Sequence, residues 1–335
     1  MTIKELLQIT CNHGASDLHC SVGAIPQMRV SGHLVPIPGA TVAEGYDVGA
    51  WLAELTTEAQ AANFSSTKDI GFLYAIPGVG RFRVAIFHAS EHPRIAIRVI
   101  PPTIPTMDEI GLPPVVKSFT ELPNGLVLVT GPNGSGKSTT LAAMINHIAQ
   151  ERAEHIVTLE DPMEFLIPHG QSVVHQRELG SDFASFQESL KHLVRLNANV
   201  VMVGEMRDLE TIAATITLAE TGHLVFATLH TMNAPQTISR IIDVFPPGQQ
   251  AQIRSQRAVS LRGVISQSLI PAVNGGRVAV REVLVNTPAT ATMIRDNKPE
   301  QLHSVMQTSG HDGMITREQS LKNLRVSGLI EGGML

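Results

Sequence analysis

The chain has 335 residues, more than twice the roughly 150 residues of a typical domain, so its length predicts two domains. Its 25 Lys and Arg and 30 Asp and Glu give a formal net charge of −5, which argues against bulk electrostatic binding to nucleic acid. A hydrophobic content of 43% excludes a wholly disordered chain. Two cysteines, Cys11 and Cys20, are too few for a disulfide framework or a four-cysteine zinc site.

The N-terminus and the hydropathy predict a cytoplasmic protein. Lys4 and Glu5 stand where the apolar core of a signal peptide would be needed. No stretch reaches the roughly 18 uncharged apolar residues of a membrane-spanning helix. The two thiols are expected to be reduced. We therefore expect contact with a membrane only through partner proteins.

Residues 1–100 have the pattern of a small α+β domain with a mostly antiparallel sheet. Thr2 and Glu5 form a capping-box pattern, which predicts a short helix ending near Gly14. A second helix is expected over Tyr46–Asn63. The expected strands form two hairpins and one further run: Gln27–Val30 with His33–Val35 around a Ser31-Gly32 turn, Ile70–Ala75 with Arg81–Ala89, and Arg94–Ile100.

A proline-rich segment then separates two regions with different sequence patterns. Five prolines fall within residues 101–114, a density typical of a linker. Beyond it, helical segments alternate with continuous apolar runs, which predicts a parallel sheet covered on both faces and an α/β domain over residues 115–335. From about Gln249 the pattern is mainly helical, with one strand pair near Arg277–Val285. The apolar runs are Leu126–Thr130, Ile156–Leu159, Val200–Val203 and Leu224–Thr228.

The first of these runs leads into a complete phosphate-loop motif, G-x-x-x-x-G-K-[ST], which opens a predicted helix. Glycines let backbone N–H groups surround a phosphate chain, and the helix start adds its positive dipole end. Lys137 is expected to reach the β and γ phosphates of ATP, and the Ser138 hydroxyl to bind Mg²⁺. The candidate nucleotide-binding residues are Gly131, Pro132, Asn133, Gly134, Ser135, Gly136, Lys137, Ser138 and Thr139.

Polar side chains follow the later apolar runs, and ligands of open α/β sheets bind at such strand ends. Glu205 follows the run most like a Walker B strand, so we interpret it as the base that activates water. The other candidates are Glu160, Asp161 and Glu164 for the metal-water shell or the γ-phosphate side, His230 for the γ phosphate, and His223 at a turn. Structural roles, as helix-cap carboxylates or buried hydrogen-bonded histidines, remain open for each.

Arginines gather on one face of the first domain. Strand alternation places Arg81 and Arg83 together, and Arg94 and Arg98 together on the neighbouring strand. Such a surface suits a phosphate contact supplied from another domain or subunit, in the manner of an arginine finger. A solvated polar face over an apolar one is the alternative interpretation.

With these residues in place, the chain resembles the type II/IV secretion ATPases, and among them the PilT-like retraction ATPases of type IV pili, almost from end to end. The segments that carry the resemblance are Gly14–His19, the Walker A region Gly125–Ala143, the Asp-box-like Thr158–Phe165, the Walker-B-like Val203–Thr211 and the His-box-like Ala219–Thr231.

The resemblance implies a PAS-like N-terminal domain, a RecA-like ATPase domain and a ring-shaped homohexamer. It implies that Arg81, Arg83 and Arg98 meet bound nucleotide. It further implies that ATP hydrolysis drives pilin subunits out of the filament, through a platform protein of the inner membrane at which the motor would be peripheral.

Two segments depart from the family pattern. Retraction ATPases usually carry A-I-R-x-L-I-R, whereas Ala289–Arg295 here keeps only Ala289, Ile294 and Arg295. The usual R-x-D-P-D is replaced by Arg195–Asn199, which has lost both acids. The first departure bears on coupling to retraction more than on hydrolysis.

Three other functions compete with a retraction motor. A pilus assembly or type II secretion ATPase usually has a four-cysteine zinc insertion, for which two cysteines are too few. A nucleic-acid translocase on the same core finds no support in the net charge of −5 or in the 4% aromatic content. An accessory subunit that binds nucleotide beside a second pilus ATPase would fit the altered Ala289–Arg295 segment.

Overall fold

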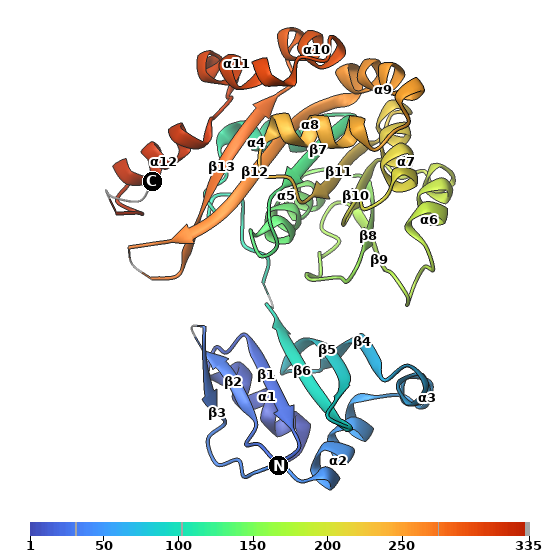
Figure 1. Ribbon diagram of the computed structural model, residues 1–335, viewed down its shortest axis with the longest axis vertical. Coiled ribbons are helices and arrows are strands. Elements are labelled where there is room, and N and C mark those ends of the chain that lie inside the picture. Colours follow the sequence, from blue (N-terminus) through green and yellow to red (C-terminus); the bar gives the residue numbers. More distant parts are fainter. Residues whose placement is uncertain (31, 102, 274, 332–335) are drawn as a thin grey trace. The chain divides into compact units, whose positions relative to one another are not determined.

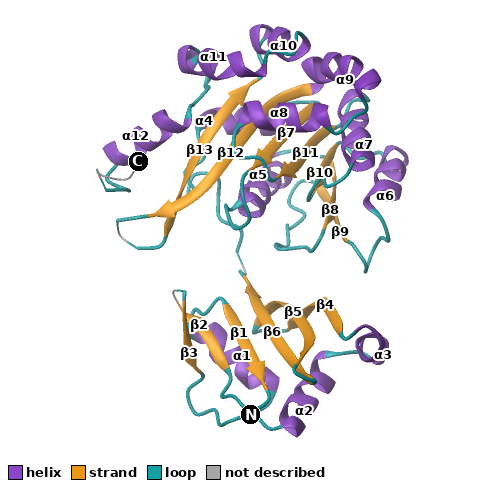
Figure 2. Ribbon diagram, in the orientation of Figure 1, coloured by secondary structure: helices purple, strands orange, loops and turns teal. Residues whose placement is uncertain are grey.

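The computed structural model describes residues 1–30, 32–101, 103–273 and 275–331. The chain forms two compact units, Met1–Thr103 and Ile104–Leu335 (Figure 1). Both combine helices with a β-sheet, so the fold is α/β with mixed sheets (Figure 2). None of the helices among the described residues has the length and apolar character needed to span a bilayer.

The first unit is built on an antiparallel sheet of order β3-β2-β1-β6-β5-β4. Its core lies on one face, where alternate residues such as Phe82, Val84 and Ile97 are buried. Each such side chain contributes roughly 1.5–3 kcal/mol by leaving water. The elements are α1 (Ile3–Asn12), β1 (Asp17–Ser21), β2 (Gln27–Val30), β3 (His33–Pro36), α2 (Gly45–Leu55), α3 (Glu58–Thr67), β4 (Asp69–Ile76), β5 (Gly80–Ala89) and β6 (His92–Ile100).

Most predicted elements of this unit are confirmed, and one is wrong. The capping box of α1 forms as expected, with Thr2 N donating to Glu5 Oε2 at 2.9 Å. The predicted strands occur as β2 to β6, although Ser31 of the first turn lies outside the described residues. The single helix expected over Tyr46–Asn63 is two helices, because Thr57 leaves the helical conformation and caps α3 through a capping box with Gln60.

The second unit holds a seven-stranded sheet of order β13-β12-β7-β11-β10-β8-β9, parallel except for β13 at one edge. Its elements are α4 (Pro114–Thr120), β7 (Gly125–Thr130), α5 (Lys137–Glu151), β8 (His155–Glu160), β9 (Val173–Glu178), α6 (Phe186–Leu193), β10 (Val200–Val203), α7 (Leu209–Glu220), β11 (Leu224–Leu229), α8 (Ala234–Asp243), α9 (Pro247–Ser260), β12 (Leu261–Pro271), β13 (Arg277–Val285), α10 (Pro288–Arg295), α11 (Leu302–Thr308) and α12 (Arg317–Val326).

Helices cover both faces of this sheet, as the continuous apolar runs predicted. Leu126 and Leu128 of β7 pack with residues of α6 to α11, whereas Val127 and Val129 pack with α4 and α5. The four predicted strands are β7, β8, β10 and β11. The sequence analysis did not predict β9 or the early start of β12 at Leu261.

The second half of the proline-rich segment packs on the second unit. Met107 and Leu112 are buried in the cluster formed by β7, α4 and α5. Pro114 opens α4 at a position where a helix tolerates the missing N–H. Residues 104–114 thus belong structurally to the second unit and tie the chain to the sheet that carries the phosphate loop.

Candidate active site

The phosphate loop joins the carboxyl end of β7 to the amino end of α5. Gly131, Gly134 and Gly136 have φ angles of 144°, 72° and 87°, which side-chain-bearing residues rarely adopt. Gly136 is the N-cap of α5 and provides no side-chain cap, so the first N–H groups of the helix are available to an anion. The Ser135 hydroxyl is buried and has no hydrogen-bond partner among the described residues. These features fit a site for a phosphate chain.

Lys137 points back over this loop. Its Nζ donates to the carbonyl oxygens of Gly131, at 2.8 Å, and Pro132, at 3.1 Å, and lies 3.4 Å from His230 Nδ1. Partial burial lowers the pKa of Lys137, and the carboxylates of Glu205 and Glu164 act in the opposite direction. The ammonium is thus held at the centre of the loop, with negative charge nearby.

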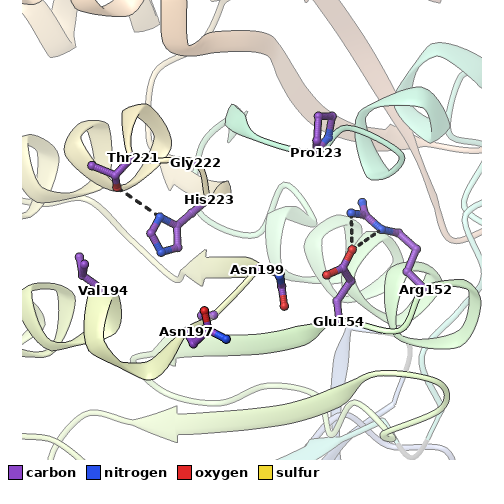
Figure 3. Close-up of a pocket in the computed structure, with 10 residues that line it drawn as sticks. Pro123, Arg152, Glu154, Val194, Asn197, Asn199, Thr221, Gly222 and His223 are labelled. Carbon is purple, nitrogen blue, oxygen red and sulfur yellow. Dashed lines mark hydrogen bonds and ion pairs between the residues drawn. The ribbon is translucent and has the colours of Figure 1, made fainter.

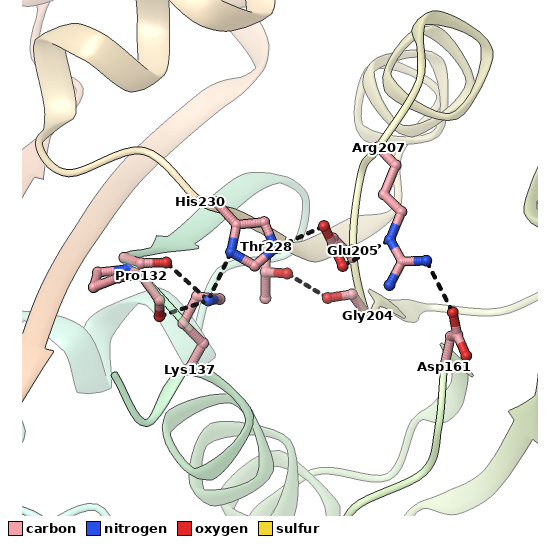
Figure 4. A network of polar contacts seen from close by, with 9 residues as sticks. Pro132, Lys137, Asp161, Gly204, Glu205, Arg207, Thr228 and His230 are labelled. Carbon is pink, nitrogen blue, oxygen red and sulfur yellow. Dashed lines mark hydrogen bonds and ion pairs between the residues drawn. The ribbon is translucent and has the colours of Figure 1, made fainter. Parts of the chain in front are cut away.

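Glu205 receives hydrogen bonds from two sides (Figure 4). Its Oε1 lies 2.7 Å from His230 Nε2, and its Oε2 accepts from Arg207 Nε at 2.8 Å. Arg207 also donates to Asp161 Oδ2 at 3.1 Å. An ammonium can only donate, so His230 Nδ1 accepts from Lys137 and its Nε2–H donates to Glu205. Partial burial alone would raise the pKa of Glu205, but Arg207 and His230 outweigh it and the pKa is lowered.

Three strand ends therefore meet at the phosphate loop, as the parallel sheet predicted. Glu205 follows β10, His230 follows β11 and Asp161 follows β8. Arg207 was not among the predicted residues, although it stands two positions after Glu205 in the Walker-B-like segment. Its role depends on Asp161, 46 residues away, and local sequence does not reveal such a contact.

Glu160, the last residue of β8, faces inward instead. It is 7% exposed, and its Oε1 accepts from Thr158 Oγ1 at 2.6 Å and from Gln176 Nε2 at 2.9 Å. Burial raises the pKa of Glu160 to about 7, above the value of 4.5 for a free side chain. Glu164 is exposed, and its charge acts on Lys137. Glu160 is thus suited to a structural role, whereas Glu164 is placed to act on Lys137 of the phosphate loop.

Replacing Glu160 by glutamine is expected to remove a pH dependence of stability. The folded protein holds a proton on this carboxyl that the unfolded chain releases near pH 4.5, so the wild-type free energy of unfolding falls as pH rises from about 4.5 to about 7. The loss amounts to about 3 kcal/mol. Urea unfolding between pH 5 and pH 8 measures it, with the exposed Glu151→Gln as control. Equal slopes in wild type and Glu160→Gln would contradict the assignment.

Comparison with known proteins places the chain in a family. Residues 74–327 match the model of the family described as type II/IV secretion system protein. The chain belongs to this family. It is 44% identical to the type IV pilus retractation ATPase PilT of Pseudomonas aeruginosa, over 98% of this chain and 96% of that protein. It is 37% identical to the type IV pilus ATPase PilU of the same organism, over 98% and 86%.

A solved structure is similar throughout. The crystal structure of the pilus retraction motor PilT with bound ADP superposes with a TM-score of 0.93, at 40% identity, and covers 99% of this chain and 95% of that one. The secretion-family fold therefore extends over both units of the chain.

One predicted site residue of this family member lies elsewhere. His223 precedes β11, at the amino end of the parallel strands, whereas the phosphate loop follows their carboxyl ends. It is buried, and its Nδ1 donates to Leu218 O at 3.0 Å. It lines a cavity of about 530 Å³ with Arg152, Glu154 and Asn199 (Figure 3). Within the second unit, the turn residue His223 therefore lies at the edge of the sheet opposite the phosphate loop and His230.

At both departures from the family pattern, residues of the chain make specific local contacts. Asn199 Oδ1 accepts from His155 N at 2.9 Å, so an amide caps the start of β8 where the family usually has an acid. Asn197 has a φ of 51°, a conformation that asparagine tolerates well. In α10, Thr290 is buried and completes a capping box with Thr287, which a branched apolar residue could not do.

The arginines form a polar face on the first unit. Arg83 and Arg98 are direct cross-strand partners, and Arg81 lies two residues before Arg83 on the same face. Arg98 Nε donates to Asp17 Oδ1 at 2.9 Å. Burial raises the pKa of Asp17, but Ser16 and Arg98 outweigh it and the pKa is lowered. Arg81 Nη1 is buried and has no hydrogen-bond partner among the described residues.

No group of three or more histidine, cysteine, aspartate or glutamate side chains able to hold a metal occurs in the described part of the chain. Magnesium beside phosphates is commonly bound by one or two protein oxygens together with phosphate oxygens and water, and the Ser138 hydroxyl in the first turn of α5 fits such a role.

Proposed function

We propose that this chain is an ATP-hydrolysing motor that powers retraction of type IV pili. One observation carries the proposal: a phosphate loop, a histidine and a carboxylate are joined from Lys137 through His230 to Glu205 at one edge of the sheet. The similarity to PilT over nearly the whole chain supports pilus retraction as the work that this hydrolysis performs.

The residues divide the chemistry of hydrolysis between them. The loop from Gly131 to Gly136 binds the phosphates through N–H groups, and Lys137 turns from the loop carbonyls to the stronger phosphate acceptors. The Ser138 hydroxyl would hold Mg²⁺, which would neutralise phosphate charge. Glu205 takes a proton from the attacking water through a lone pair that His230 and Arg207 leave free. His230 links Glu205 to the phosphate side, and Asp161 and Glu164 would supply negative charge for the metal-water shell.

The first unit supplies the remaining cations. We interpret residues 1–100 as a PAS-like domain, residues 101–114 as the connection and residues 115–335 as a RecA-like domain. In a homohexameric ring, Arg81, Arg83 and Arg98 reach a nucleotide at a subunit boundary. The unpartnered Arg81 Nη1 supports an anion there, and so do the opposed charges of Arg83 and Arg98, of which Asp17 offsets only that of Arg98.

Replacing Arg83 by alanine is expected to slow ATP hydrolysis by about tenfold or more while ATP affinity changes less. The side chain stabilises charge that develops in the transition state, and Arg81 and Arg98 remain to share the task. Turnover and ATP binding of the assembled protein measure this, with Lys4→Ala in the same unit as control. An unchanged rate in an intact assembly would show that these arginines form only a solvated polar face.

The partners follow from the proposed task. The motor acts in the cytoplasm, peripheral to the inner membrane, on the platform protein of the pilus machine. The altered Ala289–Arg295 segment favours one second candidate, an accessory nucleotide-binding subunit beside a second pilus ATPase. Nucleic acid is not an expected partner, given the net charge of −5.

Two measurements test the proposal. Purified protein is expected to hydrolyse Mg-ATP by itself, and cells that carry Glu205→Gln are expected to keep pili but to lose retraction of labelled filaments. Glu210→Gln, an exposed carboxyl on α7, is the matched control. ATP binding without turnover would favour the accessory function. Normal retraction in Glu205→Gln cells, with no turnover by the purified variant, would contradict a motor role in pilus retraction.

A further inference from the structure

A glutamine of β12 holds the phosphate loop and its helix together. Gln267 Nε2 donates to the carbonyl oxygen of Ser135 at 2.8 Å, and Gln267 Oε1 accepts from Thr140 Oγ1 at 2.9 Å. The side chain is 3% exposed. Its orientation is fixed, because the Ser135 carbonyl can only accept a hydrogen bond and so must face the amide nitrogen.

The backbone of the same residue limits the other end of the loop. A Cβ at Gly131 would lie 2.1 Å from Gln267 O, so the loop passes β12 at a distance that only glycine allows. Gly136, the N-cap of α5, lies against the side chain, since its Cβ would be 3.3 Å from Gln267 Nε2. Gln267 therefore touches the loop at its first residue, at its middle and at the start of the helix.

We propose that Gln267 is a positioning residue that presets the phosphate loop for nucleotide, an inference that rests on the proposed ATPase function. The Ser135 carbonyl must point away from the bound phosphates if the following N–H groups are to point toward them, and Gln267 Nε2 holds it there. Thr140, one turn into α5, fixes the amide from the other side. Without the amide, the loop would have to become ordered each time nucleotide binds. The conformational entropy lost in that step lowers the affinity for nucleotide.

The expected result is a loss of affinity with little loss of maximal rate. Gln267→Met keeps the length of the side chain and removes both bonds, so the Kd for ADP and the KM for ATP are expected to rise roughly tenfold or more. The kcat at saturating ATP is expected to stay within about threefold, because Lys137 and Glu205 are unchanged. Thr140→Val should shift the same constants in the same direction, and Thr140→Ser, which keeps the hydroxyl, should restore them.

A matched control separates positioning from general stability. Asn286 Nδ2 donates hydrogen bonds to the carbonyl oxygens of Ala258 and Leu261. Its side-chain amide thus makes two hydrogen bonds near the start of β12. Asn286→Leu is expected to lower the melting temperature about as much as Gln267→Met and to leave the Kd for ADP unchanged.

The outcomes divide clearly. If Asn286→Leu weakens ADP binding as much as Gln267→Met does, for the same loss of melting temperature, Gln267 only stabilises the fold and the inference is wrong. If kcat falls and KM stays constant, Gln267 does not preset the loop. If Gln267→Met does not fold, the Thr140→Val and Thr140→Ser pair decides the matter by the same constants. Wild-type protein that binds no ADP would overturn the proposed function and this inference with it.

Discussion

Replacing Lys137 by alanine is expected to weaken ATP and ADP binding by roughly 100-fold. Lys137 is the cation at the centre of the loop, and its Nζ already lies on the carbonyls of Gly131 and Pro132 that border the phosphate position. The substitution removes the charge-assisted bonds to the phosphates and leaves Glu205 and Glu164 with less positive charge nearby. Titration with a fluorescent ADP measures the effect.

The control for this variant is Lys117→Ala, which removes an exposed lysine of α4 and should leave the affinity unchanged. A Kd for ADP that is the same in Lys137→Ala and in wild type would show that the loop does not bind phosphate through this residue. A melting temperature close to that of wild type would confirm that the loss of binding does not reflect unfolding.

Replacing Glu205 by glutamine is expected to lower kcat by about a thousandfold and to keep ATP affinity within a few-fold, within the range for loss of a general base. The lowered pKa of Glu205 keeps the wild-type carboxylate ionised at neutral pH, ready to accept a proton from water. Glutamine still accepts from His230 or Arg207 but cannot take the proton. Phosphate release under single-turnover conditions measures the rate of hydrolysis, and a separate titration measures the affinity for ATP.

Near-wild-type hydrolysis by Glu205→Gln would show that another carboxylate is the general base. Asp161 and Glu164 are then the candidates, because Asp161 shares Arg207 with Glu205 and Glu164 acts on Lys137. Glu160 is a weaker candidate, since its side chain is bonded to Thr158 and Gln176 on the inner side of the sheet.

Local patterns predicted the parts of the site that are continuous in sequence. The loop from Gly131 to Ser138 could be recognised because one strand, one turn and one helix start are adjacent in the chain. Gln267 and Arg207 could not be assigned in this way. Gln267 meets Ser135 across 132 residues, and Arg207 meets Asp161 across 46, so both roles depend on which strands become neighbours in the sheet.

The sheet edge at which His223 lies could be predicted from the sequence. The histidine stands before the run Leu224–Leu229, and His230 stands after it. Parallel strands place all residues that follow them at one edge and all residues that precede them at the other. Chain direction alone therefore separates His223 from the phosphate loop. The Thr57 to Gln60 capping box was likewise readable as the start of α3.

The position of β7 in its sheet has a consequence for synthesis of the protein. This strand lies between β11 and β12, and Thr130 at its end bonds to Ser266, 136 residues further along the chain. A nascent chain on the ribosome therefore has an open edge beside its phosphate loop until β12 emerges. Until then the phosphate loop lacks its contacts with Gln267, and the unpaired edge of β7 is a place where the partial chain could aggregate. A chain that ends before residue 261 would keep this edge of β7 unpaired.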